Sequence, residues 1–312
     1  MPPSQPIVEL REVSKRFGDR EAVCAVDLVV FEGECFGLLG PNGAGKTTTL
    51  RMVYGVARPS AGAIRVFGID VAERPREVRA RLGVTLQENV LIEALSSEEN
   101  LRIFGRYHLL GEQAITGRIE WLLDFLELHS HARMPVATLS GGFKRRLAIA
   151  MSLMNDPELL ILDEPTTGLD PAVRLALWSR IRALREDGTT VLLTTHYMDE
   201  AERLCDRVAI MCEGRIVVEG APRSLIEERL GREAVELDCE PVEEQGLLDG
   251  LPRTLRRMRA GNRLMLYADD VTPVVERVHA ADGGDRRFLI QRPANLEDVF
   301  LSLTGTQLLE GP

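Results

Sequence analysis

The sequence lacks an apolar run of the length that a membrane-spanning helix requires. No stretch approaches the roughly 18 to 20 uninterrupted apolar residues that such a helix needs. The first residues, MPPSQPIVELREV, also lack the apolar core of a signal peptide. We therefore expect a cytoplasmic protein without a transmembrane segment, whose contact with any membrane is peripheral and made through a partner.

Cysteine pairs and positive charge are scarce as well. The five cysteines form no CxxC pair, which favours reduced thiols and argues against a cysteine-ligated metal. The formal net charge is -10, so we expect no nucleic-acid partner, because binding through bulk charge needs a basic face. Of the 38 basic residues, only Lys15, Lys46 and Lys144 are lysine. A compact ammonium and a planar guanidinium are not interchangeable, so Lys46 merits attention.

Strand-like and helix-like segments alternate along most of the chain. Short β-rich runs fill residues 5–39, and apolar runs such as LLILD and TVLLTT follow further on. Helical periodicity lies between them, for example in PAVRLALWSRIRALRED. The alternation predicts an α/β fold with a mostly parallel sheet covered on both faces.

Two departures from this alternation define the expected domains. Residues from about 97 to 131 carry apolar side chains at helical spacing, which predicts an all-helical insert within a helical subdomain of about residues 88–156. After about residue 228 the regularity weakens. We therefore predict a main domain over residues 5–228 and a small α+β accessory domain over residues 232–312.

A glycine-rich loop follows the apolar strand CFGLL and opens a helix. Residues 40–47 read GPNGAGKT and fit the pattern G-x-x-x-x-G-K-[ST] of a phosphate-binding loop. Glycines let the backbone wrap around phosphates, and the start of the helix attracts the anion. We expect Lys46 to reach the β- and γ-phosphates of ATP and Thr47 to ligate Mg²⁺. The candidate ATP-contacting residues are Gly40, Pro41, Asn42, Gly43, Ala44, Gly45, Lys46, Thr47 and Thr48.

Two carboxylates end the apolar strand LLILDE, residues 159–164. We expect Asp163 to hold the Mg²⁺ shell, directly or through water, and Glu164 to be the general base that polarises the attacking water. A pair of acids after a strand is often only a solvated turn, but this pair follows a phosphate loop. His196 ends the next strand, LLTTH, and is a candidate for contact with the γ-phosphate, although many strand-end histidines are surface residues.

The ordered set of motifs resembles the ABC ATPase family over about residues 7–228. The sequence LSGGF at residues 139–143 is decisive, because a phosphate loop alone marks many families. The resemblance implies a P-loop NTPase fold with an antiparallel β subdomain, in which Phe17 stacks on adenine. It also implies that Gln87 contacts Mg²⁺ and the attacking water, and that His196 is a switch histidine.

The same resemblance implies that the chain works as a homodimer. Ser140, Gly141 and Gly142 open a helix, whose start binds anions, and in this family they close on the γ-phosphate bound by the second copy. Asp170, in the turn GLDP, is implied to couple the two sites. The chain departs from the family at Phe143, where glutamine is common.

Longer segments resemble one branch of the family, the ATPase subunits of type-2 exporters. These include daunorubicin-resistance and nodulation-factor exporters, and PANLEDVFLSLTG at residues 293–305 resembles the tail of that branch. The resemblance implies that the chain powers a separate integral-membrane permease from the cytoplasmic face. The implied cargo is a drug, lipid or glycolipid-like substrate. In this family the helical insert and the segment after Gln87, here residues 88–91, form the groove that receives the permease.

Two other functions remain open from the sequence. A soluble ABC ATPase that acts in assembly or translation is one, although translation-type members usually carry two ATPase units in one chain. An ATP-gated scaffold without turnover is the other, and the presence of both Glu164 and His196 argues against it. A gene for a six-helix membrane protein beside this one would favour the transport function.

Overall fold

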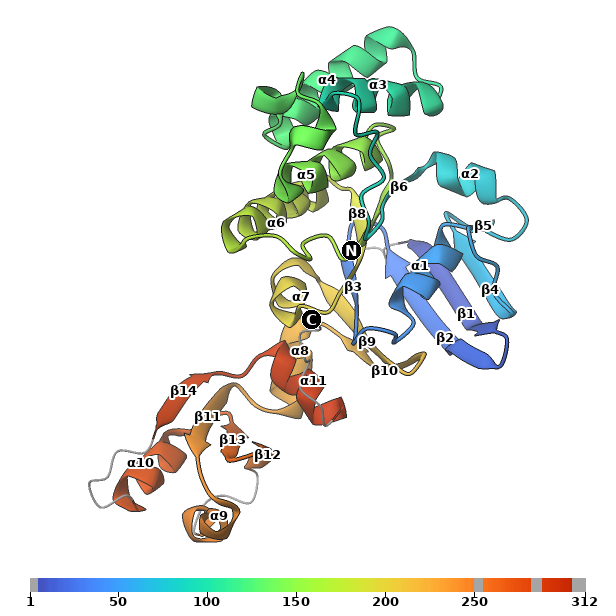
Figure 1. The fold of residues 1–312 in the computed structure, drawn as a ribbon. Coiled ribbons are helices and arrows are strands. Elements are labelled where there is room, and N and C mark those ends of the chain that lie inside the picture. Colours follow the sequence, from blue (N-terminus) through green and yellow to red (C-terminus); the bar gives the residue numbers. More distant parts are fainter. Residues whose placement is uncertain (1–4, 250–254, 282–287, 305–312) are drawn as a thin grey trace. The chain divides into compact units, whose positions relative to one another are not determined.

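The computed structural model describes residues 5–249, 255–281 and 288–304 (Figure 1). The chain folds into two compact units, which divide between Glu219 and Gly220. The end of the expected accessory domain, from residue 305 to residue 312, lies outside the described residues. None of the helices in the described ranges has both the length and the apolar character needed to cross a bilayer.

The first unit begins with an antiparallel sheet of four strands in the order β2-β1-β4-β5. The strands are β1 (Pro6–Phe17), β2 (Arg20–Phe31), β4 (Ala61–Val66) and β5 (Ile69–Asp70). Leu10 pairs with Leu28 on one side and with Ile64 on the other. All three are buried in a core that also contains Phe36 and Ile161 of the second sheet. The predicted antiparallel β subdomain is thus confirmed.

The second sheet has six strands in the order β10-β9-β3-β8-β7-β6. They are β3 (Cys35–Leu39), β6 (Leu82–Thr85), β7 (Leu159–Asp163), β8 (Thr190–Thr195), β9 (Arg207–Cys212) and β10 (Arg215–Gly220). The strands from β9 to β6 are parallel. Every residue of β3 and β7 is buried, which accounts for their apolar runs.

Parallel pairing brings the ends of three strands to one edge of this sheet. Leu39 at the end of β3 pairs with Thr195 of β8, and Asp163 at the end of β7 pairs with Thr194. After β3 the chain enters α1 (Lys46–Val53), after β7 it enters α6 (Pro171–Glu186), and after β8 it enters α7 (Met198–Leu204). The short helix α2 (Pro75–Ala80) precedes β6. The segments that follow β3, β7 and β8 therefore lie close together.

The helical insert forms α3 (Ser97–Tyr107), α4 (Glu112–Phe125) and α5 (Gly141–Ser152), with short 3-10 turns at His129–His131 and Val136–Thr138. Ser96 begins α3 with a capping box, in which its hydroxyl accepts from the backbone N–H of Glu99 and the Glu99 carboxylate accepts from the backbone N–H of Ser96. Gly105 lets α3 approach its neighbours, since a Cβ there would lie 2.8 Å from Ile115. The predicted insert is confirmed as helical.

The second unit combines a four-stranded antiparallel sheet with helices. The sheet has the order β12-β13-β11-β14, with β11 (Glu233–Asp238), β12 (Arg256–Ala260), β13 (Arg263–Ala268) and β14 (Leu289–Pro293). The helices are α8 (Pro222–Arg229), α9 (Pro241–Leu248), α10 (Thr272–Ala281) and α11 (Leu296–Thr304). Helix α8 packs against α11, so the unit begins ahead of the boundary expected from the sequence. The expected α+β character of this part is confirmed.

Candidate functional site

The phosphate loop owes its shape to glycines with left-handed backbone angles. Gly40, Gly43 and Gly45 have φ values of 147°, 81° and 109°, a region that side-chain-bearing residues rarely adopt. A Cβ on Gly45 would lie 2.5 Å from the carbonyl oxygen of Ala22, and one on Gly40 would lie 2.1 Å from that of Met211. Space as well as backbone conformation therefore requires glycine at these two positions.

Lys46 is the first residue of α1, and its ammonium lies back over its own loop. It donates to the carbonyl oxygens of Gly40 at 2.7 Å and Pro41 at 3.1 Å. It also lies 3.8 Å from Oε1 of Glu164. Burial lowers the pKa of Lys46, and the charges of Glu164 and Asp163 oppose that shift. The lysine is thus a buried cation at the point where the loop meets the end of β7.

The Asp163 carboxylate accepts hydrogen bonds from the hydroxyl groups of two other segments. The hydroxyl of Thr47 donates to its Oδ1 at 3.1 Å and that of Thr194 donates to the same atom at 2.5 Å. The aspartate is 4% exposed. Carboxylate and hydroxyl oxygens are hard donors of the kind that Mg²⁺ prefers, so the residues present at this point fit a magnesium site.

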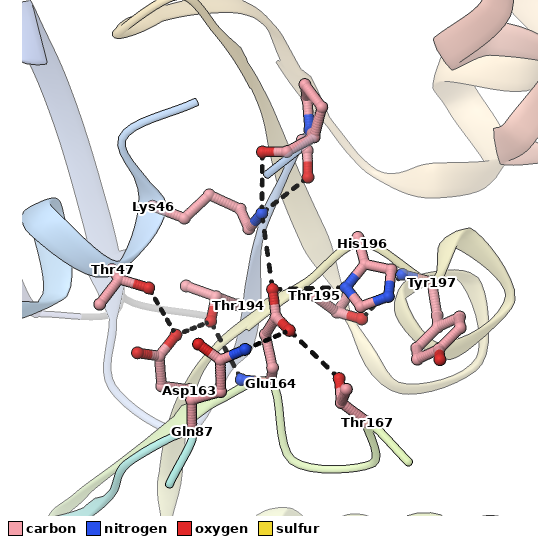
Figure 2. A network of polar contacts seen from close by, with 12 residues as sticks. Lys46, Thr47, Gln87, Asp163, Glu164, Thr167, Thr194, Thr195, His196 and Tyr197 are labelled. Atoms are coloured by element: carbon pink, nitrogen blue, oxygen red, sulfur yellow. Dashed lines mark hydrogen bonds and ion pairs between the residues drawn. The ribbon is translucent and has the colours of Figure 1, made fainter. Parts of the chain in front are cut away.

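Glu164 is surrounded by four polar side chains, as Figure 2 shows. Gln87 Nε2 donates to its Oε2 at 3.3 Å, and the hydroxyl of Thr167 donates to the same oxygen at 3.2 Å. His196 Nδ1 lies 3.3 Å from Oε1, within ion-pair distance. Burial raises the pKa of Glu164, but His196, Lys46 and Thr167 outweigh it and leave the pKa below its ordinary value. The group is therefore a carboxylate at neutral pH, as a general base must be.

The backbone of Glu164 is unusual for a side-chain-bearing residue. Its φ is 47°, in the left-handed region. Its N–H bonds to both oxygens of Thr194, the carbonyl at 3.1 Å and the hydroxyl at 3.1 Å. Strained backbone of this kind persists only where the surroundings hold it, and it is frequent at functional sites.

A pocket of about 460 Å³ opens beside these groups. It is lined by Phe17, Arg20, Ala22, Asn42, Gly43, Gly45, Lys46, Thr47, Thr48, Gln87 and Glu164. The structure thus brings most of the proposed ATP-contacting residues together with the candidate base. Gly40, Pro41 and Ala44 shape the loop without lining the pocket. Arg20 and Ala22 were missed by the sequence reasoning, although Arg20 follows Phe17 closely enough to have been a candidate.

The serine and glycines of LSGGF lie outside this pocket lining. Ser140 precedes the first turn of α5, and Gly142 packs so closely on α6 that a Cβ there would lie 3.1 Å from Val173. Asp170 is the N-cap residue of the same α6. Phe143 stacks on His131 with ring centroids 3.7 Å apart. The start of α5 therefore packs against the first turn of α6, outside the pocket lining.

The segment that contains Gln87 forms part of two surfaces. Gln87 lines the pocket beside Glu164, whereas Leu86, Glu88 and Val90 line a second, mostly apolar groove of about 350 Å³. The other residues of this groove come from the C-terminal ends of α1 and α3 and from α2, β6 and α5. They include Tyr54, Arg79, Phe104, Tyr107, His108 and Met151. Val90 and Tyr107 are 70% and 78% exposed. We call this surface the insert groove.

Two family models match the chain. The model described as "ABC transporter" matches residues 23–167. The model described as "Nodulation factor export protein NodI, C-terminal domain" matches residues 248–305. The matches thus fall in both units of the structure.

Curated relatives match over nearly the whole length. The "Nod factor export ATP-binding protein I" of Cupriavidus pinatubonensis is 46% identical over 303 residues, which cover 97% of this chain and 92% of the relative. The protein of the same name from Burkholderia pseudomallei is 47% identical over 305 residues, with 97% and 98% covered.

Solved structures resemble the larger part of the chain. A structure described as "ATP binding subunit of ABC transporter" has a TM-score of 0.65 and 32% identity, and the match covers 71% of this chain and 92% of the other. The dimeric cassette MJ0796, in a post-hydrolysis state bound to ADP and Pi, has a TM-score of 0.63 and 27% identity, with 69% and 98% covered. These matches confirm the predicted fold.

Proposed function

The chain belongs to the ABC transporter ATPase family, in the branch of the type-2 exporters, and from that premise we propose that it powers a separate membrane permease. It is an ATP-hydrolysing subunit. The cargo that we propose is a glycolipid of the lipo-chitooligosaccharide class or a related amphiphile. The observation that carries this proposal is the identity of about half of all residues to Nod factor export ATP-binding proteins across both units.

We propose that Glu164 polarises the attacking water and that Lys46 binds the β- and γ-phosphates. The geometry supports this, because the two groups lie on one pocket and the Glu164 carboxylate already accepts two hydrogen bonds. Gln87 and His196 contact the same carboxylate and orient it. Phe17, 56% exposed at the pocket rim, offers a ring face for adenine.

Mg²⁺ is the proposed cofactor, held by Thr47, Gln87 and Asp163. When bound, it neutralises charge on the β- and γ-phosphate oxygens. The hydroxyl of Thr47 and the carboxylate of Asp163 already point at each other across 3.1 Å. The buried Thr194 hydroxyl fixes the orientation of that carboxylate.

A second copy of the chain is the proposed partner at the nucleotide. ABC cassettes of this fold form dimers, as the MJ0796 structures do. In this chain Ser140, Gly141 and Gly142 open α5 away from the chain's own pocket. We propose that they close on the ATP of the other copy, with Asp170 beside them in the contact.

The insert groove is the proposed docking site of the permease. It is concave and largely apolar, with exposed Val90 and Tyr107 at its edge, and exposed apolar surface of this kind marks interaction sites. The chain would then work at the cytoplasmic face of the membrane, held there through the permease.

The first test compares wild type with Glu164→Gln and with the control Glu158→Gln. Glu158 pairs with Arg81 at the far end of β7. We expect Glu164→Gln to lower ATP turnover by about 10²- to 10⁴-fold, the usual contribution of a general base, and to form a stable dimer in Mg-ATP by light scattering. Glu158→Gln should do neither. Equal turnover in Glu164→Gln and wild type would overturn the assignment of the base.

The second test concerns the permease. An affinity-tagged form of the chain is purified in detergent from the cells that produce it, and any integral-membrane protein that remains bound is identified by mass spectrometry. Tyr107→Glu, in the insert groove, should abolish co-purification, whereas Val217→Asp, on the exposed side of β10, should not. If wild type hydrolyses ATP but retains no membrane protein, the result contradicts the transport function. It then supports the alternative, a soluble ABC ATPase that acts in assembly or regulation.

A further inference from the structure

Arg145 lies in the second turn of the helix that LSGGF opens, and its side chain is almost entirely buried. It is 4% exposed. Its three guanidinium nitrogens donate to the backbone carbonyl oxygens of Leu86 (2.5 Å), Gln87 (3.3 Å), Asp163 (2.8 Å), Glu164 (2.9 Å) and Pro165 (2.8 Å), and to the side-chain oxygen of Asn89 (3.2 Å). Since arginine has five N–H donors, the hydrogen-bonding capacity of the group is fully used.

These acceptors belong to two segments that are far apart in the sequence. Residues 86–89 contain Gln87, which lines the nucleotide pocket, and begin the wall of the insert groove. Residues 163–165 carry the two catalytic carboxylates at the end of β7. Arg145 therefore joins α5, the Gln87 segment and the end of β7 at one point.

The bonds are made mostly to neutral peptide oxygens rather than to carboxylates. Burial lowers the pKa of Arg145 to about 10, while the charges of Asp163, Glu200 and Glu164 oppose that shift. The group is still a cation at neutral pH. A buried cation is tolerated only when it is fully hydrogen-bonded, and its bonds are stronger than those between neutral groups. The surrounding backbone is consequently held firmly to the guanidinium.

We propose that Arg145 is a positioning residue that makes the signature helix, the Gln87 segment and the Glu164 backbone move as one body. It is not part of the pocket lining and acts through Gln87 and Glu164. A shift of α5 on dimer closure, or of residues 86–90 on docking at the insert groove, then reaches the catalytic carboxylate directly. This inference rests on the ATPase assignment and adds a coupling element to it.

The neighbouring basic residues show that the role is specific to position 145. Lys144 pairs with Glu93, and Arg146 bonds to Leu126 and Glu127. Neither contacts the strand end or the Gln87 segment through a described bond. A lysine at position 145 would have a single nitrogen and could not reproduce the planar fork that serves both segments.

Arg118 offers a matched control. It is a partly buried arginine of α4 that donates to backbone at the end of α5, namely to the carbonyl oxygen of Leu153 from Nε at 3.0 Å and Nη2 at 2.8 Å. Leu153 is the C-cap residue of α5, at the opposite end from LSGGF. Arg118→Gln therefore removes arginine–backbone bonds from the same helix without touching residues 86–89 or 163–165.

The test measures Arg145→Lys, Arg145→Gln and Arg118→Gln in full-length protein. For both Arg145 variants we expect kcat to fall about 10- to 100-fold through misplacement of the reacting groups, with the Kd for ATP changed by less than about twofold because pocket contacts remain. Amide hydrogen exchange in residues 86–90 and 163–167 should accelerate about tenfold or more, as expected when local opening becomes easier. Arg118→Gln should show neither change.

Four results separate the possible failures. Unchanged exchange and kcat in folded Arg145→Gln overturn the proposal, and so does the same kcat loss in Arg118→Gln. If wild type itself has no ATPase activity, the proposed function fails, while the exchange data still decide whether Arg145 holds the two segments. If neither Arg145 variant folds, Asn89→Ala removes one acceptor from the other side. Faster exchange of residues 86–90 in that variant supports the proposal, and unchanged exchange overturns it.

Discussion

The ammonium of Lys46 lies 3.8 Å from the carboxylate of Glu164, and both side chains are almost completely buried. The contact joins the phosphate loop after β3 to the proposed general base after β7. Each group offsets the charge that burial would otherwise leave unpaired. A nucleotide phosphate that binds Lys46 therefore also changes the electrostatic surroundings of Glu164.

Replacement of Lys46 by alanine should weaken ATP binding about 10- to 100-fold, because hydrogen bonds to charged groups contribute about 1.5 to 3 kcal/mol. Titration with a fluorescent ATP analogue measures the change. Lys144→Ala is the control, since Lys144 pairs with Glu93 and lies outside the pocket lining. Equal affinities for the two variants would contradict the assignment of Lys46 as a phosphate ligand.

Two glycines of the phosphate loop should respond differently to alanine. Both positions have left-handed backbone, which costs a residue with a Cβ about 1 to 2 kcal/mol. A Cβ on Gly43 has its nearest neighbour, an Arg20 nitrogen, at 3.7 Å, whereas one on Gly45 meets the Ala22 carbonyl at 2.5 Å. Gly45→Ala should therefore lower the free energy of unfolding in urea more than Gly43→Ala does. The opposite order would show that the loop relaxes around the added methyl group.

Glu200 predicts a pH dependence of stability. It has no exposed surface and accepts hydrogen bonds from Thr166 at 2.7 Å and Trp178 at 2.9 Å. Burial raises the pKa of Glu200 above its ordinary value of 4.5, against the opposing effect of its hydrogen bonds. The protonated form is thus favoured by folding. Its stabilising contribution is complete below pH 4.5 and is lost as the pH rises through the raised pKa.

Glu200→Gln should consequently gain stability relative to wild type as the pH rises. Urea unfolding of both proteins between about pH 5 and pH 8 measures this difference, because stability follows the difference in bound protons. The amide oxygen of glutamine can still accept from Thr166 and Trp178. A difference that stays constant over this range, or that falls with pH, would contradict the prediction.

Tyr267→Phe should destabilise the second unit alone. The Tyr267 hydroxyl donates to Asp298 at 2.9 Å in a fully buried site, where Arg292 also donates to the same carboxylate at 2.7 and 2.8 Å. Loss of the hydroxyl should cost about 1 kcal/mol, the typical net value of one hydrogen bond. Calorimetry should show the loss, with ATP turnover unchanged. Tyr107→Phe, at an exposed position of the other unit, is the control.

The sequence predicted what is encoded locally. The phosphate loop is contiguous, so its glycines and Lys46 could be identified from spacing alone. The same holds for β7, whose five buried residues run directly into Glu164. The alternation of strands and helices predicted the parallel sheet, because burial on both faces demands continuous apolar runs.

What the sequence could not predict depends on distant segments meeting. Arg145 reads as one of several basic residues on a helix, and only the fold reveals that residues 86–89 and 163–165 converge on it. The left-handed backbone of Glu164 leaves no compositional sign either, since glutamate does not favour it. Gln87 carries no motif of its own, so family resemblance was needed to select it, whereas His196 was a candidate from its place at the end of a strand.

The segment around Gln87 contributes residues both to the insert groove and to the pocket beside Glu164. Leu86, Glu88 and Val90 line the insert groove, whereas Gln87 of the same segment lines the proposed ATP pocket. A small apolar molecule lodged in the groove would leave the pocket open to ATP while pressing on the residue beside Glu164. A ligand of the insert groove would therefore lower the maximal rate of ATP hydrolysis without competing with ATP. Such an inhibitor would not need to bind the nucleotide site, which other proteins of this fold share.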